Sequence, residues 1–184
     1  MAATFFAVVG GSGVGKDTVI NGAKPKLVET GAFHFPRRWI TRAPDPLGEN
    51  HHSVTPEMFD QMRQAGAFCL WWGAHELQYG ISSQVHDQLN EGQNVIANIS
   101  RNSVPEANRT FPRIEVLEIT AGRELREARL KARGRENQEQ IVNRSNRCVE
   151  RSWAGNLTVV EIANDSTIEV AVNRFVAAVT GLSD

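Results

Sequence analysis

The 184 residues, 41% of them hydrophobic, are enough for one domain with a sizeable core. The 20 basic and 21 acidic side chains leave a formal net charge of -1, which predicts no binding to nucleic acid or to a membrane surface. No apolar run reaches the roughly 18 residues that span a bilayer, and the first residues lack a basic signal segment, so we expect a cytoplasmic protein.

Strand-like and helix-like segments alternate in the first half of the chain. Residues 4–9 are an apolar run typical of a buried strand, and a helix should begin at Lys16 and meet the helix-disturbing Pro25. Further on we expect a strand near 39–40 and a helix capped by Thr55 that ends near Gly66. Extended pieces at 68–75 and 79–81 and a helix from Ser82 or Ser83 to Glu91 complete this half.

The second half continues the alternation, with strands expected at 94–99, 114–119 and 157–162. Charged helices at 123–133 and 138–151 flank the turn GREN, and a last helix is capped near Ser166. Such alternation predicts an α/β fold with a parallel sheet flanked by helices, in a single domain over 1–184. Residues 37–82 break the alternation, which predicts a small substrate-binding lobe.

The stretch VVGGSGVGKDTV, residues 8–19, has the glycine spacing of a phosphate-binding loop and lies between a strand and a helix. Glycines allow backbone amides to point at a ligand, and a lysine can bridge the outer phosphates of a nucleoside triphosphate. The predicted nucleotide-binding residues are Gly10, Gly11, Ser12, Gly13, Val14, Gly15, Lys16, Asp17 and Thr18. The alternative is a glycine-rich turn without a ligand. Asp17 is unexpected, because a hydroxyl residue usually stands there.

Several further segments resemble the guanylate-kinase-like P-loop kinases, and within them the branch that phosphorylates ribose 1,5-bisphosphate in phosphonate breakdown. The segments are RRWITRAPDPLGEN (37–50), FCLWWGAHELQYGIS (68–82), VIANISR (95–101), LKARGRENQEQIVNR (130–144) and TVVEIANDSTIEVAVNRF (158–175). This resemblance covers nearly the whole chain and implies a guanylate-kinase-like fold with a small substrate-binding lobe and a helical lid.

This sequence differs from those of true guanylate kinases at positions that, by the resemblance, bind the acceptor. Leu70 stands where those kinases carry a guanine-reading glutamate, Gln78 replaces a tyrosine, and Asp45 replaces an arginine. A site that loses a required hydrogen-bond acceptor loses selectivity by orders of magnitude. The resemblance implies that the acceptor of this chain carries a phosphate, as GMP does, but has no guanine base. The implied substrate-binding residues are Arg38, Arg42, Glu49 (near a sugar hydroxyl), Tyr79, Ser100 and Arg101. The alternative for the arginines is a solvated basic face.

The resemblance also suggests a reason for Asp17. Related kinases carry an acidic pair where this chain has Asn98 and Ser100, so Asp17 would restore one carboxylate for Mg2+. Mg2+ keeps several waters and needs few protein ligands. The alternative is that Asp17 only stabilises the positive end of its helix.

The resemblance implies that Lys16 and two lid arginines, Arg133 and Arg144, are catalytic, within a lid region at 123–151. Arg135 and Arg147 are weaker candidates, and solvated amphipathic helices are the alternative. Asn164 is expected to border the adenine. The histidines have no metal-binding spacing, and Cys69 and Cys148 are expected to be ordinary thiols, although a disulfide between them stays open.

The implied function is ATP-dependent phosphorylation of a small phosphorylated sugar, ribose 1,5-bisphosphate, to 5-phospho-alpha-D-ribose 1-diphosphate, with Mg2+ as cofactor. Guanylate kinase and a non-catalytic guanylate-kinase-like interaction module are the alternatives. The sequence leaves the oligomeric state open, a homodimer being one option.

Overall fold

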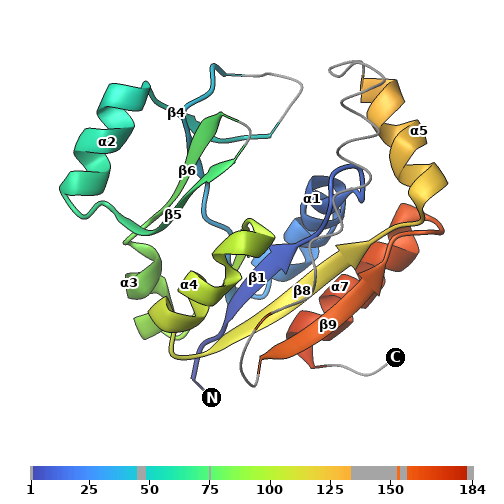
Figure 1. Ribbon diagram of the computed structural model, residues 1–184. Coiled ribbons are helices and arrows are strands. Elements are labelled where there is room, and N and C mark those ends of the chain that lie inside the picture. The colour runs from blue at the N-terminus through green and yellow to red at the C-terminus, as the bar shows by residue number, and fades with distance from the viewer. Residues whose placement is uncertain (1, 45–48, 75, 134–152, 154–156, 182–184) are drawn as a thin grey trace.

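Five parallel strands form the central sheet in the computed structural model, which describes residues 2–44, 49–74, 76–133, 153 and 157–181 (Figure 1). The strand order is β2, β7, β1, β8, β9, and Phe6 of β1 pairs with Ile96 on one side and Glu115 on the other. The bounds are β1 (Phe5–Val9), β2 (Phe33–His34), β7 (Asn94–Asn98), β8 (Ile114–Thr120) and β9 (Thr158–Ala163). The predicted α/β fold with a parallel sheet is confirmed.

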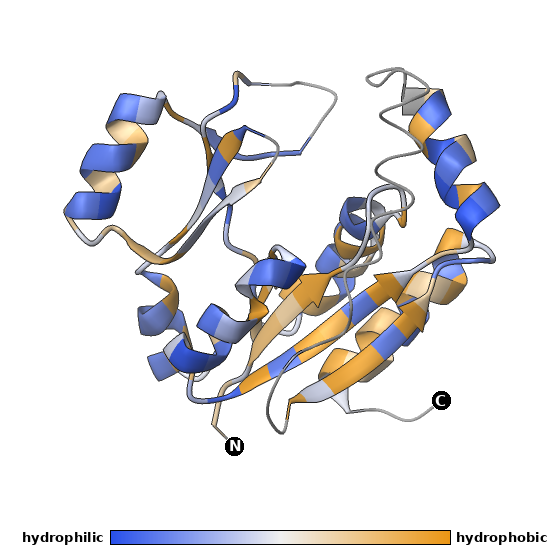
Figure 2. Cartoon of the chain, in the orientation of Figure 1, coloured by the Kyte–Doolittle hydropathy of each residue, from blue (hydrophilic) through white to orange (hydrophobic). Residues whose placement is uncertain are grey.

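Both faces of this sheet are buried. Phe6 and Val8 of β1 point into a core that α1 (Lys16–Val28) and α7 (Ile168–Thr180) cover. Phe5, Ala7 and Val9 point the other way, into a core with α3 (Val85–Asn90) and α4 (Val104–Thr110). Burial on both faces explains why β1 is continuously apolar. Figure 2 shows many hydrophobic residues along β1, β8 and β9 and many hydrophilic residues on α2 and α5.

A second sheet forms the small lobe, in the strand order β4, β3, β6, β5. Its strands are β3 (Trp39–Ile40), β4 (His52–Ser53), β5 (Phe68–Ala74) and β6 (Leu77–Ser82), and α2 (Pro56–Gln64) belongs to the same part of the chain. Leu70, Trp72 and Ile81 of the hairpin β5–β6 pack into the core beside β1. In Figure 1 the lobe and α5 (Arg123–Arg133) stand on opposite sides of the edge at which the central strands end. The substrate-binding role of the lobe stays a prediction.

Local signals located most helix starts correctly. The Thr55 hydroxyl accepts a hydrogen bond from the Met58 amide at 3.2 Å and caps α2, as predicted. The last helix is capped by Thr167, one residue after the predicted position. Helix α1 continues through Pro25 to Val28 without a break.

Other expectations were wrong or incomplete. The cap of α3 is Gln84 without a side-chain bond, because the Ser83 hydroxyl donates instead to the Gly66 carbonyl at 2.8 Å. The sequence did not predict β2, β4, α4 or the 3-10 helix η1 (Arg101–Ser103). The helix expected at 138–151 and the GREN turn lie outside the described residues. No described helix combines the length and the hydrophobicity that crossing a membrane requires.

Candidate active site

The phosphate loop connects β1 to α1 and is pressed against neighbouring strand ends. A Cβ on Gly10 would lie 2.4 Å from the Ile119 carbonyl oxygen, so no larger residue fits there. Gly15, the N-cap of α1, has a φ of 88°, which favours glycine. The Lys16 ammonium donates to the Gly10 and Gly11 carbonyls at 2.8 and 3.2 Å. It therefore lies across the loop, where it can reach bound phosphate groups.

A cavity of about 630 Å³ lies in front of this loop, and we call it the loop cavity. Its walls are the loop itself, residues 98–102 after β7, and side chains of the small lobe that include Arg38, Arg42, Glu49 and Tyr79. Leu130 of α5 also lines it. The structure thus brings the predicted donor-binding loop and the predicted acceptor-binding residues into one chamber.

Asp17 lies in the first turn of α1 and lines the loop cavity. Its Oδ1 accepts a hydrogen bond from the Asn98 side-chain amide at 2.8 Å. Asn98 ends β7, so the two residues join the helix to the adjacent strand. Thr18, the next residue, instead lines a second cavity of about 630 Å³, the α1 cavity, which follows residues 17–24 and 35–38.

Arg38 and Glu49 form a forked ion pair inside the lobe. Arg38 Nε donates to Glu49 Oε1 at 2.6 Å, and its Nη2 donates to Oε2 of the same carboxylate. Arg38 Nη1 donates to the Asn98 carbonyl at 3.1 Å, and the guanidinium lies 5.2 Å from the Tyr79 ring centroid. The side chain of Arg38 is 11% exposed. Arg38 therefore ties the lobe to β7, and its predicted contact with a substrate phosphate stays a prediction.

Arg42 is less fully engaged. Its Nη2 lies 3.9 Å from Glu49 Oε2, and its buried Nε has no hydrogen-bond partner in the described part of the chain. His51 beside it donates from Nδ1 to the Glu49 carbonyl at 2.7 Å and accepts at Nε2 from the Ser53 hydroxyl at 3.1 Å. The His51 ring thus fixes the segment that carries Glu49. Arg42 lines the loop cavity and forms fewer close contacts with Glu49 than Arg38 does.

The residues after β7 form the floor of the loop cavity. The Ser100 hydroxyl accepts from the Asn102 amide at 3.3 Å and caps η1. Arg101 Nη2 forms an ion pair with Glu118 of β8 at 3.0 Å, and the Glu118 carboxylate is almost completely buried. Sequence reasoning identified Arg101 but missed Glu118, one of the two glutamates in the otherwise mostly apolar β8.

Helix α5 supports the phosphate loop, which the sequence did not predict. The Arg129 guanidinium donates to the carbonyls of Val14 and Asn164 at 3.3 and 3.2 Å. A Cβ on Gly13 would lie 2.8 Å from the Arg126 carbonyl oxygen. Asn164, predicted to border the adenine, is 2% exposed and donates from Nδ2 to the Val14 carbonyl at 2.8 Å. Its observed contact supports the loop, and the adenine contact stays a prediction.

Several predicted residues cannot be placed. Arg144, Arg135 and Arg147 lie outside the described residues, and so does Asp45. Arg133 ends α5, but its side chain is outside the described part of the chain. The catalytic role of the lid arginines therefore stays a prediction.

Leu70, which stands at the place of the guanine-reading glutamate, is 1% exposed and packs with Trp72 and Ile81. Trp72 in turn stacks on Tyr79, with ring centroids 5.4 Å apart. Leu70 therefore lies in the core beside β1, whereas Trp72 and Tyr79 line the loop cavity.

Three titratable side chains outside the loop cavity, His34, His52 and Cys69, have shifted pKa values. Burial lowers the pKa of His34 and of His52, and the positive charges of Lys24 and Arg37, respectively, lower these values further. Burial raises the pKa of the Cys69 thiol to about 11. Cys69 is a free thiol.

Comparison with curated proteins found relatives along nearly the whole chain. Ribose 1,5-bisphosphate phosphokinase PhnN of Rhizobium etli is 41% identical over 175 residues, which are 95% of this chain and 88% of that protein. A bifunctional ribose 1,5-bisphosphokinase-thymidine phosphorylase of Azorhizobium caulinodans is 43% identical over 95% of this chain. The chain spans about a quarter of the length of such bifunctional relatives.

Among solved structures, guanylate kinase from Anaplasma phagocytophilum is similar, with a TM-score of 0.73, 16% identity, and coverage of 98% of this chain and 86% of that one. The fold is therefore guanylate-kinase-like. No protein-family model matches the chain.

Proposed function

The chain belongs to the ribose 1,5-bisphosphate phosphokinase family, and on that premise we propose that it transfers the terminal phosphoryl group of ATP to ribose 1,5-bisphosphate. The product would be 5-phospho-alpha-D-ribose 1-diphosphate, made during phosphonate breakdown. The observation that carries the proposal is the loop cavity, in which Lys16 and the glycine loop share one chamber with Arg42 and Tyr79.

The phosphate loop suits the donor. Backbone amides of a glycine-rich loop at a helix N-terminus bind phosphate oxygens, and the helix dipole favours their negative charge. The Lys16 ammonium, now on the Gly10 and Gly11 carbonyls, would exchange these contacts for oxygens of the outer phosphates. Arg129 and Asn164 hold the Val14 carbonyl, so the loop is shaped before the nucleotide arrives.

The lobe suits a phosphorylated acceptor. Arg42 lines the loop cavity, and a guanidinium binds phosphate oxygens well. Arg38 and Tyr79 would form the wall behind that phosphate, held rigid by Glu49 and Trp72. The Glu49 carboxylate would accept a hydrogen bond from a sugar hydroxyl while it remains bonded to Arg38.

The proposed chemistry is an in-line displacement at the terminal phosphorus of ATP. An oxygen of the anomeric phosphate forms the new bond, the bond to the bridging oxygen breaks, and ADP leaves. That phosphate is already ionised at neutral pH, so no general base is required. Catalysis then depends on positioning and on positive charge around the transferred group. Lys16 supplies one such charge, and Arg133 and Arg144 are proposed to supply others.

Mg2+, which kinases of this kind use, would neutralise charge on the outer phosphates. Among the described residues no three or more His, Cys, Asp or Glu side chains are grouped so that they could hold a metal ion, so a metal would depend on few protein ligands. Asp17 fits this requirement, because it is a carboxylate that lines the loop cavity and that Asn98 orients. Hard oxygen ligands of this kind, together with phosphate oxygens and water, suit Mg2+.

Release of ADP from ATP tests the proposal against both alternatives. The experiment compares ribose 1,5-bisphosphate, GMP and no acceptor at equal concentrations with Mg2+ present. We expect acceptor-dependent ADP release with ribose 1,5-bisphosphate and negligible release with GMP, because the apolar Leu70 stands where the resemblance places the guanine-reading glutamate. Robust turnover of GMP would indicate a guanylate kinase. No release with either acceptor would favour the non-catalytic module.

A further inference from the structure

The α1 cavity adjoins the loop cavity and is not used by the chemistry proposed above. The two cavities share five lining residues, namely Asp17, Arg38, Arg42, Glu49 and Asn98. A ligand that reaches past this shared wall from the loop cavity therefore enters the α1 cavity. At about 630 Å³ the α1 cavity has room for a phosphate and part of a sugar.

The α1 cavity is rich in positive charge. Four cationic side chains and two carboxylates line it, which leaves an excess of two positive charges. Both carboxylates already have partners, since Glu49 binds Arg38 and Asp17 accepts from Asn98. Two of the cations, Lys24 and Arg37, line this cavity and not the loop cavity, and neither forms an ion pair with a described carboxylate.

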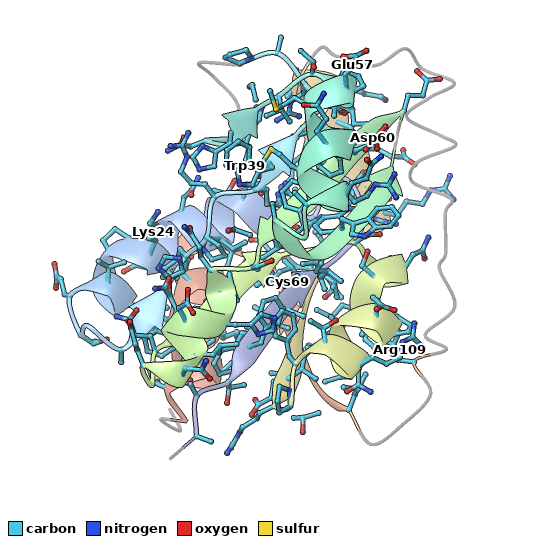
Figure 3. The ribbon with its side chains drawn as sticks, turned by 90° about the vertical axis from the view of Figure 1, so that its left-hand side faces the viewer. Lys24, Trp39, Glu57, Asp60, Cys69 and Arg109 are labelled. Atoms are coloured by element: carbon cyan, nitrogen blue, oxygen red, sulfur yellow. The ribbon has the colours of Figure 1, made fainter. Side chains whose placement is uncertain are left out.

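Lys24 lies on the same face of α1 as Asp17, which lines both cavities. Asp17, Asn21 and Lys24 are spaced four and three residues apart, so they share one face of the helix. Seven residues at a rise of 1.5 Å separate the ends of this row by about 10 Å. Helical side chains lean toward the N-terminus, which shortens the reach from the ammonium to the loop. Figure 3 labels Lys24 on α1, with Trp39 of the lobe above it.

Arg37 approaches the same space from the segment that enters the lobe. Its Nη2 donates to the His51 carbonyl at 3.0 Å, which fixes the guanidinium and uses one of its five N–H donors. The Lys24 ammonium lies 5.6 Å from the centroid of the Phe35 ring, on the wall that leads to Arg37. The cavity thus contains the ammonium group of Lys24 and the planar guanidinium of Arg37, and both kinds of group bind phosphate.

We propose that the α1 cavity binds the distal phosphate of the acceptor, the phosphomonoester on C5, with Lys24 and Arg37 as its cationic contacts. This inference rests on the proposed function, because the two phosphates of a pentose 1,5-bisphosphate stand at opposite ends of the sugar. When the anomeric phosphate faces ATP, the other phosphate must lie elsewhere. A phosphomonoester carries about 1.5 to 2 negative charges at pH 7, which matches the excess of the cavity. A neutral base in that place would leave both cations unpaired.

Paired changes in enzyme and substrate test the proposal. Lys24→Gln and Arg37→Gln are assayed with ribose 1,5-bisphosphate and with ribose 1-phosphate, which lacks the distal phosphate. Each substitution should raise KM for the bisphosphate about tenfold, the effect of losing one charge-assisted hydrogen bond, and should leave KM for ATP unchanged. The same substitutions should change kcat/KM for ribose 1-phosphate less than twofold. Lys24→Arg should retain most of the affinity.

Lys26→Gln is the matched control, because Lys26 lies on the same helix and donates to Asn173 Oδ1 at 2.9 Å, away from the cavity. It should change neither KM. Equal losses with both acceptors, or no loss with either, would overturn the distal-phosphate site. If the wild type uses no ribose bisphosphate at all, the proposed function fails separately. In that case the affinity for ribose 5-phosphate, measured by calorimetry, tests the cavity on its own. If Lys24→Gln leaves this affinity unchanged, the distal-phosphate site is overturned.

Discussion

Replacing Asp17 by asparagine removes one negative charge from the loop cavity with little other change. Asp17 Oδ1 accepts a hydrogen bond from Asn98 Nδ2 at 2.8 Å, and an asparagine carries an amide oxygen that can occupy the same place. The contact between α1 and β7 should survive in the variant. Any effect on catalysis then reports the charge of residue 17.

The size of the effect follows from Coulomb's law. Two unit charges 4 Å apart interact by about 1 kcal/mol in water, so a carboxylate and a dication that share a water ligand interact by about 2 kcal/mol. Loss of about 2 kcal/mol should raise the Mg2+ concentration for half-maximal rate about thirtyfold. If the carboxylate only stabilises the helix N-terminus, its loss lowers the free energy of unfolding by at most about 1 kcal/mol.

The assay is a Mg2+ titration of the initial rate at saturating ATP, with thermal unfolding of the same samples. Asp17→Ser should recover part of the loss, because a hydroxyl is again an oxygen ligand at that position. Titration curves of the wild type and both variants that superimpose would refute the metal role of Asp17.

Three other perturbations have defined outcomes. Gly15→Ala should abolish ATP binding and lower the free energy of unfolding by about 2 kcal/mol, because φ is 88° and the Cβ would lie 2.6 Å from Asn164 Nδ2; unchanged ATP titrations and melting curves would contradict this. Glu49→Gln should lower the free energy of unfolding by about 2 to 3 kcal/mol, since it leaves the largely buried Arg38 guanidinium without a carboxylate, and an unchanged urea midpoint would argue against it. The Cys69 thiol, with its pKa raised to about 11, should react slowly with iodoacetamide at pH 8 in the folded protein. Because folding raises this pKa, the thiol's contribution to stability is present below about pH 9 and is lost between pH 9 and 11. Peptide mapping that finds equal alkylation rates of Cys69 in the folded and the unfolded protein at pH 8 would exclude such burial.

Features set by neighbouring residues could be predicted from the sequence. The apolar run of β1, the glycines after it and the Thr55 cap each depend on residues within a few positions of one another. The phosphate loop was predicted for the same reason, since its glycines and lysine lie within seven residues.

Features set by distant contacts could not be predicted in this way. Arg129 meets the Val14 carbonyl across 115 residues of chain, and nothing in either segment indicates the other. Strands β2 and β4 have two residues each, which is too short for a periodic pattern. The partner of Arg38 was missed because Glu49 was assigned a ligand contact of its own, whereas the fold first satisfies the arginine internally.

The contact between Gly13 and α5 leaves no space for even a methyl group. Because the backbone of the loop rests directly on the backbone of the helix, neither can shift by a fraction of an ångström without the other. Helix α5 is also the first part of the region 123–151 that is predicted to be the lid. We therefore expect a ligand that displaces the loop to displace α5 with it. Under the proposed function, binding of the donor is therefore expected to move α5 more directly than binding of the acceptor.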